Sequence, residues 1–283
     1  MADAVGSRPA GWQVDGMTES RSTPGVVRLR ESTDATASKE RSWRRFGWAT
    51  TLAMHLTPAA VTFGGTLLLA PLMVRLGLPR TFAMTVAFAL LLTPLELGLL
   101  LRAAHRATGR WSLRALPAVL AYRRKLRWWV LLVPVLFAVA LVAAVGLTPL
   151  SNAIGGSLSG VYPNWLLPDY DVTTAGFSTS VLVATLLITL AVDGLINPIV
   201  EELYFRAYLL PRLPVAGWRA VPLSAGLFTV QHYWQPWNWL LIFVLQLLLS
   251  ALVVRLRSYR LGMIMHVLVN FFGTLATLLA VLA

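Results

Sequence analysis

After residue 45 the chain contains only six carboxylates, and four of them fall inside long apolar stretches: Glu96, Asp193, Glu201 and Glu202. A charged group at bilayer depth costs at least a few kcal/mol, so it requires a partner, a water-filled cavity or a function. Two adjacent glutamates in such a position are the strongest anomaly in the sequence. They are therefore the first candidates for chemistry.

Helical spacing predicts different roles for the two glutamates. If this segment is helical, Glu202 and Arg206 are i,i+4 neighbours, which is the spacing of an ion pair. Glu201 is turned about 100° away and has no such partner on its own helix. Glu202 is then held, whereas Glu201 is free to act. For this segment alone, the alternative is a buried salt bridge beside an acid that reaches toward the membrane surface.

Two of the four histidines fall in later apolar segments. His232 follows Phe228 at i,i+4, and His266 shares a helix face with Asn270. A desolvated glutamate can take a proton from water, and an imidazole can orient that water. A second imidazole and a carboxamide can donate to the oxyanion of a tetrahedral intermediate. Together these side chains form a complete set for amide hydrolysis.

The order of these motifs is more specific than any one of them. Glu-Glu-x-x-x-Arg, Phe-x-x-x-His and His-x-x-x-Asn, in this order on late apolar segments, resemble the CPBP family of intramembrane peptidases. This family comprises the type II CAAX prenyl endopeptidases and related bacteriocin-processing or immunity proteins. Residues 178–283 carry the resemblance. Ala207 departs from the family, whose bacterial members more often have Gly there, and we expect this to alter packing and not chemistry.

The resemblance implies a role for each motif residue. Glu201 would be the water-activating base, and Glu202 with Arg206 would support it. The remaining members of the implied site are His232 as partner of the water or of a metal, His266 and Asn270 as oxyanion stabilisers, and Phe228 as a supporting residue.

The residue types do not decide whether this site binds a metal. Glu201, His232 and His266 could hold zinc in the three-ligand pattern of catalytic sites. The chain has no His-Glu-x-x-His segment, which excludes the zincin helix. Of the two alternatives we favour water activation without a metal, and we expect no other cofactor.

The elements that must position these residues are membrane helices. Hydrophobic residues make up 57% of the chain and charged residues 13%, against about 25% charged in soluble domains. Apolar runs long enough to cross about 30 Å of hydrocarbon predict an all-α polytopic transmembrane helix bundle of about seven spans. The predicted spans are 49–74, 81–103, 127–148, 178–208, 217–234, 238–255 and 261–282. The fourth is too long for one straight crossing, and the fifth is short.

Three regions follow from this pattern. Residues 1–45 are polar and predict a disordered cytosolic tail. Residues 46–177 would form the N-terminal membrane helices and an outer loop over 149–177, and residues 178–283 the catalytic helix bundle. Within the spans, Glu96 could line a substrate cavity or pair with an arginine. Asp193 is i,i+4 from Asn197, which predicts a local hydrogen bond.

Loop charge predicts the orientation. Lys and Arg cluster before the first span, between the second and third, after the fourth, and between the sixth and seventh, whereas the loop 149–177 has none. The positive-inside rule then places a multi-pass protein in the cell membrane with its N-terminus in the cytosol. The net charge of +12 is explained by anionic lipid and not by nucleic acid. The expected partners are membrane lipids and a peptide or protein substrate; the oligomeric state is not predicted.

The leading hypothesis is an intramembrane endopeptidase that cleaves near the membrane surface, with CAAX-type or leader-peptide processing as its activity. Cysteine is absent, which excludes disulfides, thiolate metal sites and a cysteine nucleophile. The main alternative is a non-catalytic immunity or scaffold protein of the same fold. A third hypothesis is a small-solute transporter with Glu201 as a proton relay.

Overall fold

The computed structural model describes residues 44–124 and 129–283. The chain divides into two units, Met1–Arg41 and Ser42–Ala283, and all the described residues belong to the second. The predicted disordered tail therefore lies outside the described residues, apart from its last two positions.

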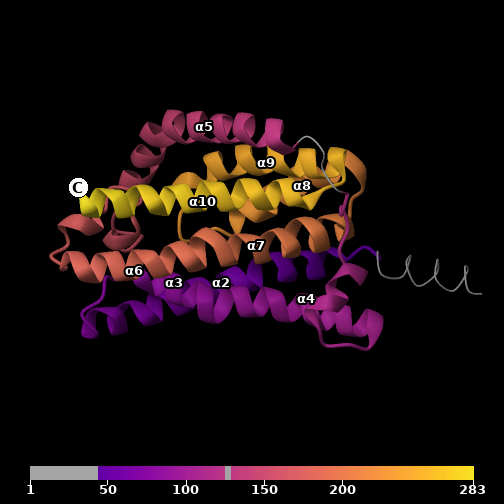
Figure 1. The fold of residues 1–283 in the computed structure, drawn as a ribbon, viewed down its shortest axis with the longest axis horizontal. Coiled ribbons are helices and arrows are strands. Elements are labelled where there is room, and N and C mark those ends of the chain that lie inside the picture. Colours follow the sequence, from indigo (N-terminus) through magenta and orange to yellow (C-terminus); the bar gives the residue numbers. More distant parts are fainter. Residues whose placement is uncertain (1–43, 125–128) are drawn as a thin grey trace, which may run out of the picture. The chain divides into compact units, whose positions relative to one another are not determined.

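The described part is helical and contains no strand, which confirms the prediction of an all-α polytopic bundle (Figure 1). Six helical stretches are long and apolar enough to cross a membrane. The first three are built from α2 (Trp48–Arg75), from α3 (Phe82–Ala87), η1 (Phe88–Leu92) and α4 (Thr93–Thr108), and from α5 (Trp129–Ser157). The fourth contains α6 (Thr179–Ala191), η5 (Val192–Ile196), α7 (Asn197–Glu201), η6 (Glu202–Leu209) and η7 (Leu210–Arg212). The last two contain η9 (Pro236–Asn238) with α9 (Trp239–Leu256), and α10 (Tyr259–Leu282). The shorter elements are η2 (Leu113–Ala118), η3 (Asn164–Leu166), η4 (Val172–Thr174), η8 (Gly217–Arg219) and α8 (Ala220–Val230).

The outward surface of this bundle is apolar. Leu68 on α2 is 81% exposed and Val142 on α5 is 73% exposed, and further large aliphatic side chains are exposed along both helices. Exposure of this much apolar surface to water is unfavourable, whereas contact of the same surface with lipid hydrocarbon is favourable. The six apolar helices therefore indicate a multi-pass membrane protein.

Two predicted boundaries differ from the structure. The predicted fifth span, 217–234, contains η8 and the 11-residue helix α8, and α8 alone rises about 16 Å, which is less than a full crossing. The predicted outer loop, 149–177, begins later, because α5 continues through Pro149 to Ser157. A proline removes one helical N–H but does not have to end a helix in a membrane.

The fourth stretch is 34 residues long, which confirms that it exceeds one straight crossing. Two of its segments, η5 and η6, are π-helical. A π-helical turn inserts residues into an α-helix and turns the following side chains to a new face, and such turns are frequent at functional sites. Here they bracket Glu201, which is the last residue of α7.

Close backbone contact brings α10 against this long helix. A Cβ atom added to Gly194 in η5 would lie 3.3 Å from the Cα atom of Phe271 in α10. Small residues permit such close approach of membrane helices. The contact places Asn270, the neighbour of Phe271, beside the backbone of η5.

A proline in α2 anchors the first helix to η6. Pro58 has no N–H, so it cannot bond the carbonyl of Met54 one turn earlier. The hydroxyl of Tyr204 donates to that carbonyl oxygen at 2.7 Å. Tyr204 therefore satisfies a backbone group that the proline leaves unpaired and links α2 to the glutamate-bearing helix.

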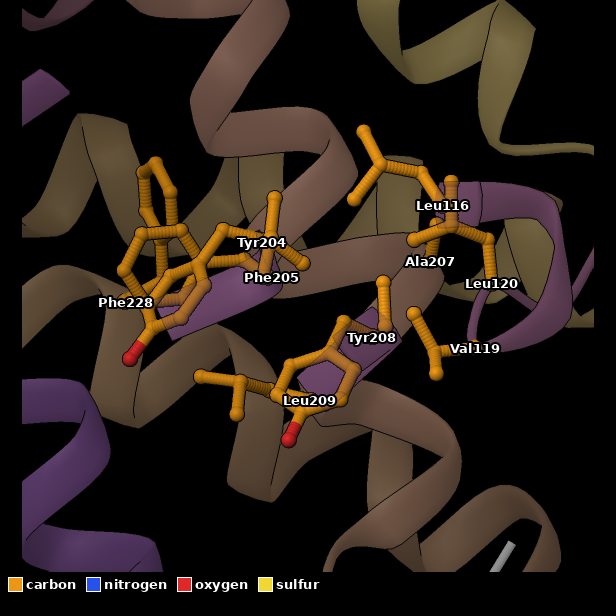
Figure 2. Packing of buried hydrophobic residues seen from close by; sticks show 11 residues of the cluster. Leu116, Val119, Leu120, Tyr204, Phe205, Ala207, Tyr208, Leu209 and Phe228 are labelled. Carbon is orange, nitrogen blue, oxygen red and sulfur yellow. The ribbon is translucent and has the colours of Figure 1, made fainter. Parts of the chain in front are cut away.

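Aromatic side chains fill the core beside the glutamates (Figure 2). The rings of Phe205 and Phe228 meet edge to face with centroids 5.0 Å apart, which is a favoured aromatic geometry. Ala207 is fully buried in the same cluster, and its carbonyl oxygen accepts a hydrogen bond from the N–H of Ala121 at 2.8 Å. The position at which this chain departs from the family is thus a packing position.

Candidate active site

Glu202 and Arg206 form the predicted ion pair. Their Oε1 and Nη1 atoms are 2.7 Å apart, and the side chains are 0% and 1% exposed. The guanidinium carbon of Arg206 also lies 4.3 Å from the centroid of the Phe228 ring, which adds a cation–π contact. Arg206 is thereby fixed by a carboxylate and an aromatic face.

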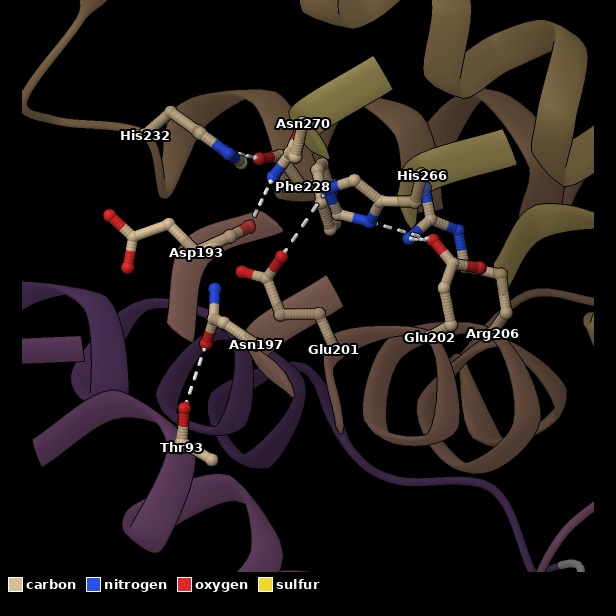
Figure 3. A network of polar contacts seen from close by, with 10 residues as sticks. All are labelled: Thr93, Asp193, Asn197, Glu201, Glu202, Arg206, Phe228, His232, His266 and Asn270. Atoms are coloured by element: carbon tan, nitrogen blue, oxygen red, sulfur yellow. Dashed lines mark hydrogen bonds and ion pairs between the residues drawn. The ribbon is translucent and has the colours of Figure 1, made fainter. Parts of the chain in front are cut away.

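One imidazole connects the two glutamates (Figure 3). Nδ1 of His266 lies 3.1 Å from Oε1 of Glu202, and Nε2 lies 3.6 Å from Oε2 of Glu201. The first distance allows a hydrogen bond, whereas the second is an ion-pair distance beyond direct hydrogen-bond range. The sequence predicted that Glu201 has no ion-pair partner on its own helix, and the ion-pair partner in the structure is His266 of α10.

Glu201 keeps one carboxylate oxygen unpaired. The residue is 2% exposed, and none of the described residues hydrogen-bonds to its Oε1. The carboxamide of Asn197, one helical turn earlier, points toward it in Figure 3. Buried polar groups are nearly always hydrogen-bonded, so the unpaired Oε1 can accept a hydrogen bond from a ligand or a water molecule.

His232 is held in one tautomer. Its Nδ1 lies 2.7 Å from the carbonyl oxygen of Phe228, and because a carbonyl can only accept, Nδ1 must carry the proton. Nε2 is left with a free lone pair. His232 follows α8 and lies outside the six candidate spans; burial lowers the pKa of His232 to about 3. The ring is therefore neutral near pH 7.

The two histidines share an aromatic neighbour. The ring centroid of Phe228 lies 4.9 Å from that of His232 and 6.0 Å from that of His266. Among the described residues, no hydrogen bond or ion pair joins His232 directly to Glu201. The Phe228 ring, on α8, therefore packs against both imidazole rings.

Asn270 is brought to the site, but its donor is occupied. Its Nδ2 donates to the carbonyl oxygen of Asp193 at 3.1 Å. The predicted local hydrogen bond between Asp193 and Asn197 was wrong. Oδ2 of Asp193 accepts from Thr85 at 2.8 Å, and Oδ1 of Asn197 accepts from Thr93 at 3.0 Å. The π-helical segment η5 contains Asp193 and ends directly before Asn197, so the two residues are not in an α-helical i,i+4 register.

Sequence reasoning missed the position of Glu96 relative to Glu201. Thr93 of α4 bonds Asn197 of α7, and Glu96 and Glu201 each follow about one turn later. Glu96 is 0% exposed, its carboxylate oxygens have no hydrogen-bond partner among the described residues, and the carboxylate of Glu201 acts on it electrostatically. Within residues 44–124 and 129–283, no arginine pairs with Glu96 as the sequence had suggested. Only the tertiary contact between the two helices reveals this third carboxyl group.

The possible zinc triad is not supported. No group of three His, Cys, Asp or Glu side chains in the described ranges is arranged to hold a metal ion. Both ring nitrogens of His266 face carboxylates, and Nδ1 of His232 is bonded to a backbone carbonyl. The set Glu201, His232 and His266 therefore does not fit a three-ligand zinc site in this geometry, and we derive no step through a metal.

Comparison with known proteins agrees with the motifs. Residues 183–272 match a family described as type II CAAX prenyl endopeptidase Rce1-like. This segment is roughly a third of the chain and contains all seven predicted site residues. No curated protein and no solved structure shows significant similarity to the chain. The resemblance predicted from the motifs is thus confirmed over this segment, and residues 183–272 are a type II CAAX prenyl endopeptidase-like region, which indicates a membrane endopeptidase.

Proposed function

We propose that the protein is an intramembrane endopeptidase that hydrolyses a peptide bond near the membrane surface, in CAAX-type or leader-peptide processing. One observation carries the proposal: His266 bridges two buried glutamates, and one of them keeps an unpaired carboxylate oxygen. A buried acid without a partner is unfavourable unless it acts. The family match over residues 183–272 supports the same reaction class.

The first step is activation of water. Oε1 of Glu201 and Nε2 of His232 both lack a hydrogen-bond partner from the side chains described above, as does Oε2 of Glu202, which lies against Gly262. Glu201 takes a proton from the water, and His232 orients it through its free lone pair. The oxygen then forms a bond to the substrate carbonyl carbon, and the carbonyl π electrons move to the oxygen.

The second step is stabilisation of that oxyanion by His266 and Asn270. When Glu201 has gained the proton, it no longer holds the Nε2–H of His266 as an ion-pair partner. The imidazole can then donate this hydrogen to the oxyanion, while Nδ1 stays bonded to Glu202. The Nδ2 of Asn270 adds a second donor when the substrate oxygen replaces the carbonyl of Asp193.

The last step returns the proton. Glu201 passes it to the leaving nitrogen, and the oxyanion re-forms the carbonyl as the C–N bond breaks. The products are a carboxylic acid and an amine, and the acid then loses its proton to the amine or to water. Glu202 and Arg206 touch no reacting atom in this scheme. They position His266, because Arg206 holds Oε1 of Glu202 and this oxygen in turn holds Nδ1 of His266.

The orientation with the N-terminus in the cytosol is part of the proposal. The basic segments meet at one end of the bundle (Figure 1): the N–H of Phe46 bonds the carbonyl of Arg212, and the N–H of Arg124 bonds the carbonyl of Arg257. Four basic segments on one side satisfy the positive-inside rule.

The test is cleavage of membrane-associated peptides by the purified full-length chain in liposomes. Glu201→Gln is isosteric and should lower turnover about 10²- to 10⁴-fold, as expected for loss of a general base. Arg114→Gln, at an exposed position, is the control and should behave as wild type. Full turnover by Glu201→Gln, with normal accumulation in membranes, would favour a non-catalytic scaffold of the same fold instead.

A further inference from the structure

A second polar feature lies at the end of the bundle opposite the basic segments. A cavity of about 360 Å³ is lined by α3 and the turn before it, the connection between α5 and α6, α6 with η5, one residue of α10, and the segment after His232. This volume is within the range of specific ligand sites. The catalytic scheme above does not use it.

Asp193 is the single charged side chain among the described residues that line this cavity. Its Oδ2 accepts from the Thr85 hydroxyl at 2.8 Å, whereas no described residue donates to its buried Oδ1. Figure 3 shows the carboxylate directed away from the Glu201 network. A largely buried carboxylate with a free oxygen and no cationic neighbour in its cavity is stabilised either by taking up a proton or by a cation that enters the cavity.

The other walls of the cavity suit an organic cation. Aromatic rings make up much of the lining: Phe82, Trp165, Tyr170, Trp234 and Trp237. A carboxylate surrounded by aromatic faces is the environment that binds ammonium and guanidinium groups, through charge-assisted hydrogen bonds and cation–π contacts. Hydroxyl groups of threonines complete the lining and can accept further N–H bonds.

Acidic residues next to the cavity also favour a cationic ligand. Asp169 and Asp171 flank Tyr170 in the connection between α5 and α6, and this connection contains no Lys or Arg. Hydrogen bonds from Thr173 lower the pKa of Asp171, so its carboxylate is ionised near pH 7. Exposed acids beside a cavity raise the local concentration of cations. Arg80, on the neighbouring turn, lines an adjoining hollow that shares Trp165 and Tyr170 with this cavity.

The cavity adjoins the catalytic residues at two points. The Trp234 ring, part of its wall, lies 5.0 Å from the His232 ring between centroids. The carbonyl of Asp193 accepts the hydrogen bond from Asn270. Asp193 precedes Glu201 by about 12 Å along the helix axis, which an extended peptide covers in three to four residues.

We propose that this cavity binds a lysine or arginine side chain of the peptide substrate, about three to four residues from the scissile bond. The carboxylate of Asp193 pairs with the cation, and Trp234 and its aromatic neighbours enclose the aliphatic part of that side chain. The assignment of the ligand as a substrate rests on the proposed peptidase function, whereas the binding itself does not.

The test is a binding measurement on the full-length chain in phosphatidylglycerol liposomes, with Glu201→Gln as background so that no peptide is cleaved. The probes are a blocked hexapeptide with one arginine, its citrulline counterpart, and the citrulline peptide with a free N-terminus. The arginine peptide should bind about 10- to 100-fold more tightly than the citrulline peptide, as a charged hydrogen bond gives. Asp193→Asn should abolish this preference, and Asp171→Asn should retain most of it.

Each outcome is decisive. Equal binding of the arginine and citrulline peptides, or a preference that survives Asp193→Asn, overturns the proposal. Tighter binding only of the peptide with a free N-terminus also overturns it, because the cation would then be a chain terminus. If binding follows the expected pattern but wild-type protein cleaves none of the bound peptides, the cation site stands and the peptidase proposal fails.

Discussion

At Gly262 on α10, substitution by alanine would add one methyl group next to the site and so test how tightly the site is packed. A Cβ atom added there would overlap Oε2 of Glu202, with Cγ2 of Val253 3.6 Å away. Glu202 is fully buried and already holds Arg206 and His266 with its other oxygen. The carboxylate of the Gly262→Ala variant must therefore move, and its contacts with Arg206 and His266 must lengthen.

The expected magnitude follows from two opposing effects. Replacing glycine with alanine in a helix stabilises it by up to about 1 kcal/mol, whereas overpacking a filled core costs about 1–3 kcal/mol. Gly273 lies on the same helix with open space around its Cβ position, so Gly273→Ala shows the first effect alone. Gly262→Ala should be about 1–3 kcal/mol less stable than Gly273→Ala.

The assay compares both variants in one detergent by thermal unfolding and by peptide cleavage. Gly262→Ala should melt at least a few degrees below Gly273→Ala and should lose cleavage, because a misplacement of about 1 Å can cost about 10²-fold in rate. Identical melting and identical cleavage by the two variants would refute the reasoning. They would mean that Glu202 is not confined between Gly262 and His266.

Three further predictions concern stability. The pKa of His232 is lowered to about 3, so its contribution to the free energy of unfolding is complete above pH 6.5 and is lost as the pH falls. At pH 5 the free energy of unfolding of the wild type should be about 2 kcal/mol lower, relative to its value at pH 7, than that of His232→Gln. Equal acid sensitivity of the two proteins would contradict this. Tyr204→Phe leaves the Met54 carbonyl unpaired and should cost about 1–3 kcal/mol in denaturant unfolding; an unchanged midpoint would contradict it. Glu96→Met removes a buried carboxyl group without a partner and should raise Tm, whereas a lower Tm would reveal a partner.

Spacing along one helix predicted contacts within that helix. The ion pair between Glu202 and Arg206 follows from i,i+4 periodicity, which survives even in the π-helical segment η6. The three motifs and their order were sufficient to predict the family and the residues that gather around Phe228. The apolar composition was sufficient to predict the helical membrane bundle.

Contacts between helices were not predictable in the same way. The bridge of His266 to both glutamates and the position of Glu96 beside Glu201 depend on how three helices cross. The error at Asp193 has a local cause, because a π-helical turn changes which side chains face each other. Apolar composition also could not separate a spanning helix from the short α8, which is buried by its neighbours and not by lipid.

The most direct test of the central claim is the mass of the cleavage products formed in ¹⁸O-labelled water. Purified wild-type protein in liposomes should release a fragment whose new carboxylate carries one ¹⁸O atom, and Glu201→Gln should form this product at least about 10²-fold more slowly. Labelled product formed at the wild-type rate by Glu201→Gln would contradict the claim that this buried carboxylate activates water.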